Sequence, residues 1–224
     1  MDKKIFEEQG FLVLGPLLDR AACDRLDAIV SQRHMDVAGT RNVLELPWCK
    51  TLAESIRTHS LIVPVLPDDA VAVQCTLFEK SASQNWLVPV HQDLSIAVRE
   101  RIKHPDLTGW SEKDGTVFVQ PPESVLRHML AIRLHLDDCG PEDGPLRVVP
   151  GSHRHGRMTN EQALAERDRH GEILCPVERG AALLMKPLLL HASSKSRGES
   201  RRRVLHFVYG PRHLPCGLQW RMVV

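Results

Sequence analysis

The sequence predicts a mostly β fold, an antiparallel sandwich or barrel with helices packed outside. Helix signals gather near the start of the 224-residue chain, many short apolar runs follow them, and glycines and prolines separate these runs. The later runs lie too close together to hold the crossover helices that a parallel sheet needs. Because the chain shows no internal repeat and no linker, we expect a single domain over residues 1–224.

Three helices are predicted from capping residues and apolar spacing. Asp19 can cap the first helix, whose apolar side recurs at helical spacing: Ala22, Leu26, Ile29 and Val30. Residues 51–54 (TLAE) have the form of a capping box and predict a second, short helix. Residues 159–162 (TNEQ) have the same form and predict a polar helix that Gly171 can close.

The strands are predicted from apolar runs rich in β-forming residues. In the run MLAIRLHLD, the leucine and isoleucine side chains alternate with other residues, so they share one face of a strand. The predicted strands cover residues 71–79, 86–91, 129–137, 146–149, 173–177, 181–190 and 204–209. This spacing of short strands is typical of a sandwich or barrel.

Residues 99–127 interrupt the series of strands. This segment is long, polar and contains prolines, and long loops inside compact domains are often lids or binding loops. We therefore expect a lid insertion at about 99–127, while a solvated surface insertion remains the alternative.

Composition excludes several classes of protein. With 29 Lys+Arg against 28 Asp+Glu, the net charge is +1, which does not favour a nucleic-acid partner. No run of 18 apolar residues predicts a membrane span, and the N-terminal residues do not resemble a signal or transit peptide. The six cysteines contain no CxxC pair, so we expect reduced thiols and a cytoplasmic protein. The sequence makes no prediction about oligomeric state.

The 12 histidines invite a search for a metal site. Three His-x-Asp triplets occur, at residues 91–93, 104–106 and 135–137. The first follows an apolar strand, where side chains two residues apart project from the same face, so His91 and Asp93 can meet one cation. A third histidine would complete a facial triad with open positions, which is typical of non-heme Fe(II) oxygenases. The triplet alone is weakly specific, because a histidine-rich chain produces such triplets by chance.

Four blocks of sequence, taken in order, carry a family resemblance. They are FEEQGFLVLGPL, PVHQD, RLHLDDCGPEDGPLRVVPGSHRHG and LLMKPLLLHASSKSRGESRRRVL. Together they resemble the phytanoyl-CoA dioxygenase family of Fe(II)/2-oxoglutarate oxygenases. The resemblance implies a double-stranded β-helix, that is, a jelly-roll barrel, which agrees with the predicted strands.

The resemblance implies a ligand set and a co-substrate site. The iron ligands fall on His91, Asp93 and His191. The arginine that holds the distal carboxylate of 2-oxoglutarate falls on Arg202, within a run of three arginines where the register could differ by one residue. In a strand only one of the three points inward, so we expect the flanking Arg201 and Arg203 to point outward to solvent.

Three further residues are implied to lie in the cofactor pocket. Ser193 matches a serine that helps to hold the same carboxylate. Gln74 and Thr76 lie on a strand that precedes the His-x-Asp triplet by the distance seen in ectoine hydroxylase. A buried glutamine in an apolar strand needs a partner, which a pocket or the backbone can supply.

The function implied is an oxygenase that uses Fe(II), 2-oxoglutarate and O2 to hydroxylate a small molecule, releasing succinate and CO2. The chain is shorter than the phytanoyl-CoA enzymes and shows no phosphate-binding loop, so the family name does not indicate its substrate. Two alternatives remain open. A non-redox metal-binding cupin, such as an isomerase or lyase, could use the same ligands, and so could a non-catalytic ligand-binding relative.

Overall fold

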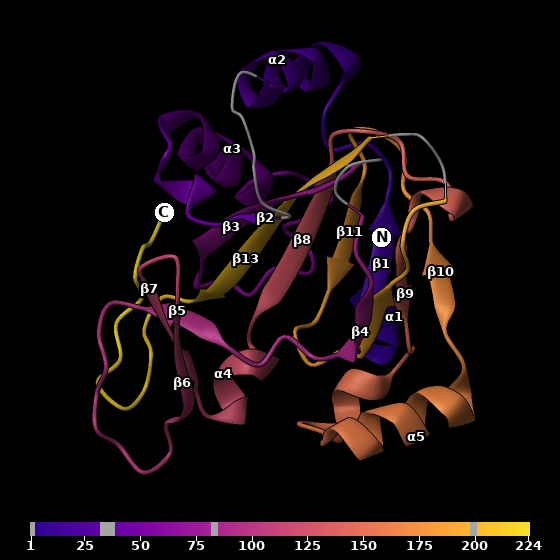
Figure 1. Cartoon of the computed structure of the whole chain (residues 1–224). Coiled ribbons are helices and arrows are strands. Elements are labelled where there is room, and N and C mark those ends of the chain that lie inside the picture. The colour runs from indigo at the N-terminus through magenta and orange to yellow at the C-terminus, as the bar shows by residue number, and fades with distance from the viewer. Residues whose placement is uncertain (1–2, 32–38, 82–84, 198–200) are drawn as a thin grey trace.

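The computed structural model describes residues 3–31, 39–81, 85–197 and 201–224, which form three antiparallel sheets (Figure 1). The six-stranded sheet has the order β1 (Phe11–Leu14), β11 (Ala182–Met185), β8 (Leu130–His135), β13 (Arg202–Pro211), β3 (Ala70–Lys80) and β2 (Gly39–Thr40). The four-stranded sheet has the order β10 (Ile173–Cys175), β9 (Leu146–Val148), β12 (His191–Ser193) and β4 (Val88–His91). A third sheet joins β5 (Ile96–Val98), β7 (Thr116–Gln120) and β6 (Thr108–Lys113).

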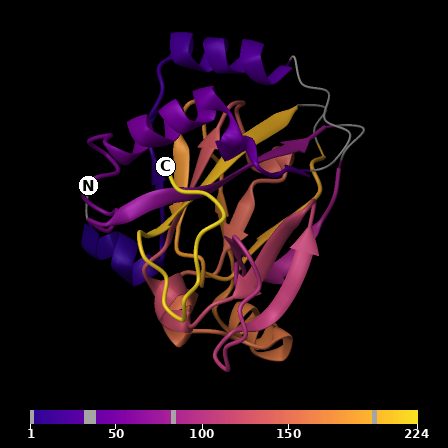
Figure 2. The same ribbon diagram turned by 90° about the vertical axis from the view of Figure 1, so that its left-hand side faces the viewer.

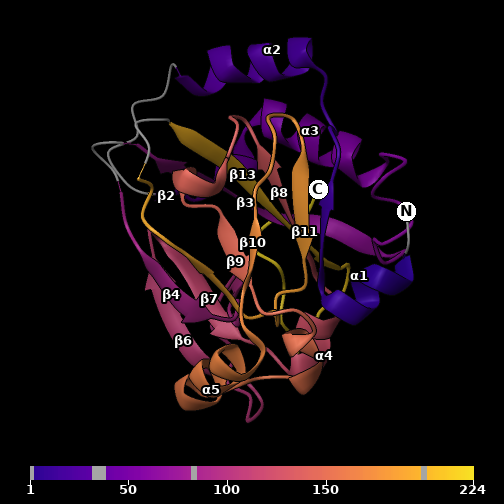
Figure 3. The ribbon, with the colours of Figure 1, turned by 90° about the vertical axis from the view of Figure 1, so that its right-hand side faces the viewer.

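The six-stranded sheet separates two hydrophobic layers. Helices α1 (Lys3–Gln9), α2 (Arg20–Ser31) and α3 (Pro47–Arg57) contribute apolar side chains to the core on its outer face, and Figure 2 shows α2 and α3 on this side. On its inner face, a second apolar cluster joins β8 and β11 to β9 and β10 of the smaller sheet, which Figure 3 shows in front of it. The predicted sandwich with helices outside is therefore confirmed.

Alternation along β13 and β3 distributes side chains between these layers. Leu205 and Phe207 belong to the helix-side core, so Arg202 and His206 project to the inner face between the sheets. Cross-strand pairing sets His206 opposite Thr76 on β3 and opposite Arg133 on β8. The inner face of the large sheet therefore carries polar residues as well as apolar ones.

Two predicted helix starts are confirmed and one is wrong. Asp19 accepts a hydrogen bond from the backbone N–H of Ala22 and caps α2. Thr159 caps α5 (Asn160–His170), and Gly171 ends it at a φ of 72°. Helix α3 instead begins at Pro47, whose fixed φ and missing N–H suit a first helical position, so the 51–54 box lies inside the helix.

The predicted strand at 181–190 is two strands in different sheets. Strand β11 ends at Met185, and the chain turns through Pro187, with Leu189 N–H donating to the Lys186 carbonyl at 3.0 Å. Strand β12 then begins at His191 in the smaller sheet. The proline explains the break, because it has no N–H to donate to the sheet.

The segment 99–127 is more regular than a polar loop. It forms strands β6 and β7 and helix α4 (Glu123–Arg127), and it buries Val119 and Leu126. Asp114 and Gly115 both have positive φ (51° and 70°), which is typical of a tight hairpin turn between such strands. The Asp-Gly pair was therefore a sequence signal for this hairpin.

Three short 3₁₀ helices connect the other elements, at Val43–Glu45, Pro141–Asp143 and Ser152–His155. All six cysteines are free thiols, and five of them are buried. Among the residues that the structure describes, no helix is long and apolar enough to cross a membrane.

Candidate active site

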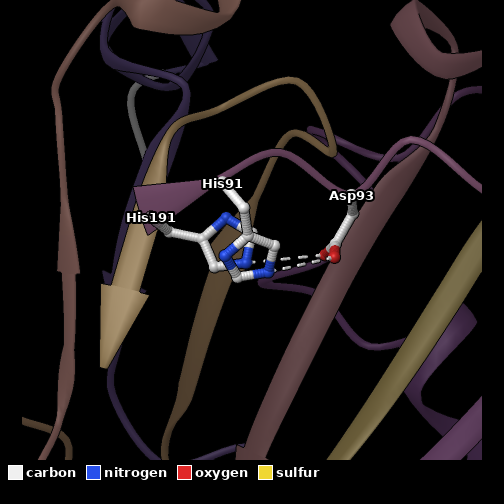
Figure 4. Close-up of side chains that lie close together, drawn as sticks. All are labelled: His91, Asp93 and His191. Carbon is white, nitrogen blue, oxygen red and sulfur yellow. Dashed lines mark ion pairs between the residues drawn. The ribbon is translucent and has the colours of Figure 1, made fainter. Parts of the chain in front are cut away.

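The pairing of β12 with β4 brings two distant histidines together. His191 and His91 are direct antiparallel partners, and their ring centroids lie 4.2 Å apart. Asp93 follows β4 and is fixed by its own N–H, which donates to the Pro187 carbonyl at 2.9 Å. Its carboxylate faces both imidazoles (Figure 4), 3.8 Å from His91 Nε2 and 3.7 Å from His191 Nε2. The structure thus brings together the three predicted ligands.

Backbone hydrogen bonds fix the tautomer of both imidazoles. His91 Nδ1 lies 2.9 Å from the Pro89 carbonyl, and His191 Nδ1 lies 2.9 Å from the Leu189 carbonyl. Because a carbonyl oxygen only accepts, each Nδ1 carries the hydrogen. Each Nε2 therefore directs a lone pair toward Asp93, which is the arrangement of a metal site with oriented ligands.

Electrostatics keep His191 and Asp93 in their ligand forms. Burial lowers the pKa of His191 to about 4, against the opposing effect of Asp93, so this imidazole is neutral at pH 7. Burial would raise the pKa of Asp93, but the nearby histidines and Arg133 outweigh it and hold that pKa below its usual value. His191 and Asp93 therefore offer one lone pair and one anion to a metal near neutral pH.

Gln92, between the two ligands, anchors this stretch of chain. Its side-chain N–H groups donate to the carbonyls of Gly156 (2.8 Å) and Leu188 (2.6 Å). Its side-chain oxygen accepts from the backbone N–H of Met158 at 2.9 Å. These bonds fix the direction in which the residues on either side project. Sequence reasoning missed this role, because its partners lie 64 to 96 residues away.

A cavity of about 180 Å³ adjoins the triad and contains two predicted co-substrate residues. Arg202 is buried and donates to the Gly144 carbonyl, and its Nε has no hydrogen-bond partner among the described residues. Ser193 is also buried and donates to the same carbonyl at 3.0 Å. Of the three consecutive arginines, Arg202 is the one whose side chain lines this cavity.

Two further cations in this cavity were missed from the sequence. Lys80 is 1% exposed and donates to Ser193 Oγ at 2.7 Å and to the Ser194 carbonyl. Burial, reinforced by Arg202 and Arg133, lowers the pKa of Lys80 to about 7. Arg133 donates to His206 Nδ1 at 3.2 Å, and its own Nε is unpartnered among the described residues. Buried cations outnumber the single carboxylate, Asp93, so the cavity is suited to an anion.

The expectation for Arg203 is wrong. Arg201 is exposed and pairs with Glu79, as predicted for an outward arginine. Arg203 also leaves the inner face, but its side chain is only 5% exposed, because α2 covers that side of the sheet. It donates to both oxygens of Asp137, at 2.6 and 2.8 Å, and to Asp27 of α2. Arg203 therefore links α2 to the six-stranded sheet through ion pairs.

A larger cavity of about 330 Å³ also adjoins the triad, at His91 and Asp93. Gln74 and Thr76 line it and hydrogen-bond to each other at 3.2 Å, whereas they do not line the cavity that contains Arg202. Both cavities are lined by His91, Asp93 and His206. The segment 99–127 also reaches the larger cavity through three side chains, namely Lys113, Phe118 and Leu126.

Of the two rival triplets, 135–137 is no metal site. His135 is buried on β8, and Asp137 is paired with Arg203. Triplet 104–106 lies beside Cys216. The first triplet, completed by His191, is the cluster that adjoins both cavities, and its two imidazoles and one carboxylate are the donor set that suits ferrous iron.

Comparison with known proteins agrees with this site. The family model of the phytanoyl-CoA dioxygenases (PhyH) matches residues 6–204. L-proline trans-4-hydroxylase from Streptomyces griseoviridis is 28% identical over 133 residues. That match covers 47% of this chain and 46% of the hydroxylase, so it spans just under half of the relative's length.

Solved structures share the fold at low identity. HygX from Streptomyces hygroscopicus, solved with nickel and 2-oxoglutarate bound, has a TM-score of 0.64 at 20% identity, covering 92% of this chain and 84% of HygX. EctD from S. alaskensis, in its apoform, has a TM-score of 0.67 at 17% identity, covering 93% of this chain and 75% of EctD. The predicted double-stranded β-helix is thereby confirmed. The chain belongs to the phytanoyl-CoA dioxygenase family of non-heme Fe(II)/2-oxoglutarate-dependent dioxygenases.

Proposed function

We propose that this protein hydroxylates a small molecule, with ferrous iron held by His91, Asp93 and His191 and with 2-oxoglutarate in the smaller cavity. One observation carries the proposal: a cationic cavity and a larger cavity, lined by both apolar and polar residues, meet at the same His-Asp-His cluster. Bound together, ferrous iron and 2-oxoglutarate supply an O2-dependent oxidation that releases succinate and CO2. The protein positions the two organic reactants on either side of one metal.

The smaller cavity would bind the dicarboxylate by charge and by directed donors. The guanidinium of Arg202, with its unpartnered Nε, can pair with the distal carboxylate through two hydrogen bonds. Ser193 and Lys80 lie on the same wall, already hydrogen-bonded to each other. A bound anion would offset the repulsion among Lys80, Arg133 and Arg202, which is why this cavity favours a dicarboxylate over a neutral ligand.

The larger cavity would hold the substrate and exclude water from it. Its wall combines apolar and polar side chains, and Gln74 and Thr76 are neighbouring polar groups that can orient a substrate by hydrogen bonds. We propose that the 99–127 segment sets specificity, because Lys113 and Phe118 line this cavity from its hairpin. The similarity to L-proline trans-4-hydroxylase makes free amino acids the first substrates to test.

The test is succinate formation from 2-oxoglutarate, with Fe(II) and O2, in the presence of a panel of small molecules that begins with L-proline. We expect at least one compound to stimulate turnover and to gain one oxygen atom. Asp93→Ala should abolish turnover, because the metal loses its only anionic ligand. The matched control is Asp69→Ala, which removes an exposed aspartate in the turn before β3.

Two results would overturn the proposal. Full turnover by Asp93→Ala would remove the ligand assignment. A metal-loaded protein that binds the panel's compounds but forms no succinate would favour a non-redox cupin or a binding protein. Neither alternative gives a reason for an arginine buried beside the triad with an unpartnered Nε.

A further inference from the structure

We propose that His104, Asp106 and Cys216 form a second metal site, for a divalent ion of the zinc class. Each residue offers one ligand atom, and the three atoms all lie within 4.8 Å of one another. His104 and Asp106 lie between β5 and β6, and Cys216 lies in the C-terminal segment after β13. None of the three lines either cavity of the candidate active site.

The His-to-Asp distance in this cluster equals that in the first. His104 Nδ1 lies 3.8 Å from Asp106 Oδ2, and His91 Nε2 lies 3.8 Å from Asp93 Oδ1. This separation is too long for a hydrogen bond between the two atoms. Two ligands on one tetrahedral zinc ion lie about 3.4 Å apart, since each is about 2.1 Å from the metal. The His104 and Asp106 atoms therefore need to approach each other by only a few tenths of an ångström, and Cys216 Sγ lies within 4.8 Å of both ligand atoms.

The donor atoms are accessible and in a suitable chemical state. His104 Nδ1 accepts a long hydrogen bond, 3.2 Å, from the backbone N–H of Asp106, so this nitrogen carries a lone pair, and a metal would replace that weak bond. Cys216 is the one cysteine of the six that is not buried. Its thiol can lose a proton to solvent as a metal binds, giving a thiolate ligand.

The backbone already holds these two segments together. Val98 and Trp220 form an isolated antiparallel bridge, and Arg99 N–H donates to the Gln219 carbonyl at 3.0 Å. Figures 1 and 2 show the C-terminal segment running beside β5. Cys216 itself has a φ of 60°, an uncommon left-handed conformation for a residue other than glycine, and sits at the turn of this segment.

The donor set indicates the metal and the role. A thiolate favours zinc over the hard cations that prefer oxygen ligands, and three protein ligands leave a fourth position for water at this exposed place. The ion would cross-link the 99–127 segment to the C-terminal segment. Trp220, on the C-terminal segment, and Ala97, on β5 just before the 99–127 segment, both line the larger cavity. Zinc would therefore brace one wall of that cavity without touching the reacting atoms.

The test is cobalt(II) titration of the full-length, metal-free protein, followed by the thiolate-to-cobalt charge-transfer absorption. Of the two clusters among the described residues, the first contains no sulfur, so only the second can produce this band. Because the first cluster can also bind cobalt, we expect the wild-type band to saturate between one and two cobalt per chain, and zinc to displace it. Cys216→Ser should abolish it, and Asp93→Ala should leave it unchanged, which separates this proposal from the proposed oxygenase.

His104→Gln keeps the thiol and should weaken cobalt binding by more than about tenfold, since even the loss of an outer-shell partner has that effect. The matched control is His170→Gln, an exposed histidine at the end of α5, which should bind cobalt as the wild type does. A wild-type protein without the band, or a Cys216→Ser protein that keeps it, would overturn the proposal. If Cys216→Ser fails to fold, by circular dichroism, His104→Gln decides the question.

Discussion

Replacing Lys80 with methionine is expected to weaken the binding of 2-oxoglutarate and, at the same time, to stabilise the metal-free protein. Lys80 is 1% exposed, and its ammonium group lies with two guanidinium groups, Arg133 and Arg202, in one cavity. Methionine keeps most of the side-chain length and removes the charge. The two effects have opposite signs, because the same charge that opposes burial attracts the dicarboxylate.

The effect on stability follows from the pKa of Lys80, which burial and the neighbouring arginines lower from 10.5 to about 7. A difference of about 3.5 pH units corresponds to about 5 kcal/mol that opposes folding while the amine is charged. Because the folded-state pKa of this base is depressed, the unfolded state binds more protons between pH 7 and 10.5, and the wild-type free energy of unfolding rises with pH through that window.

In Lys80→Met, the free energy of unfolding should depend much less on pH between pH 7 and 10.5. The gain at pH 7 is smaller than 5 kcal/mol, because the Ser194 carbonyl loses its donor, which costs about 1–3 kcal/mol. A net gain of about 2 kcal/mol would raise the melting temperature by roughly 4–8 °C. Differential scanning calorimetry of the metal-free protein from pH 6.5 to pH 9 measures both the gain and its dependence on pH.

Lys80→Met also removes a charge-assisted hydrogen bond from the ammonium group to bound 2-oxoglutarate. Such a bond contributes about 1.5–3 kcal/mol, so the Kd for 2-oxoglutarate should rise roughly 10- to 150-fold. In the wild type, Kd should also rise as pH increases above 7, by up to about tenfold per pH unit, because only the charged amine attracts the dicarboxylate. Calorimetric titration of the nickel-loaded protein measures Kd without turnover.

The control for both experiments is Lys50→Met, which removes an exposed lysine of α3. Its melting temperature and its Kd should match those of the wild type. Two results would contradict the reasoning: a Kd in Lys80→Met that depends on pH as steeply as in the wild type, or a Lys80→Met protein that is less stable than the wild type at pH 7.

Three further predictions concern the surrounding residues. Arg203→Leu leaves the Asp137 carboxylate uncompensated and should lower the free energy of unfolding by about 3 kcal/mol; a urea titration that shows under about 1 kcal/mol would contradict this. Gly144→Ala places a Cβ 2.5 Å from the Ser194 carbonyl oxygen at a backbone φ of 65°. It should lower the free energy of unfolding by about 1–3 kcal/mol and raise KM for 2-oxoglutarate. Unchanged kinetics would argue that the contacts of the Gly144 carbonyl with Ser193 and Arg202 do not matter for binding. Gln92→Leu removes three hydrogen bonds next to the proposed iron ligands. It should weaken iron binding about 10- to 100-fold, measured by competition with a chelator. An iron affinity equal to that of the wild type would mean that these bonds do not orient the ligands.

Local features were readable in the sequence because they depend on neighbours in the chain. Thr159 and Gln162 are three residues apart and make the predicted capping box by themselves. The alternation of a strand puts Arg202 on the inner face of β13 once the strand is recognised. Local signals can still mislead, as residues 51–54 show, since Pro47 supplied a better helix start nearby.

The cations of the smaller cavity were not readable in this way. Lys80 ends β3 and Arg133 lies in mid-β8, and nothing near either residue in the chain indicates that they share a cavity. In β8, Leu130, Ile132 and Leu134 belong to the helix-side core, while Ala131 packs between the sheets, so Arg133 faces that space as well. Burial on both faces of a sheet cannot be inferred from one strand.

By itself, the sequence determined the type of fold, the caps of two helices and, through its resemblance to a family, the residues proposed as iron ligands. Only the tertiary structure decided that His91 and His191 are cross-strand partners, that Arg203 is buried under a helix, and that two cavities meet at one cluster. The physical reason is range: helix capping and strand alternation act within a few residues, whereas burial, charge compensation and metal coordination depend on groups that the folded chain brings together from distant positions.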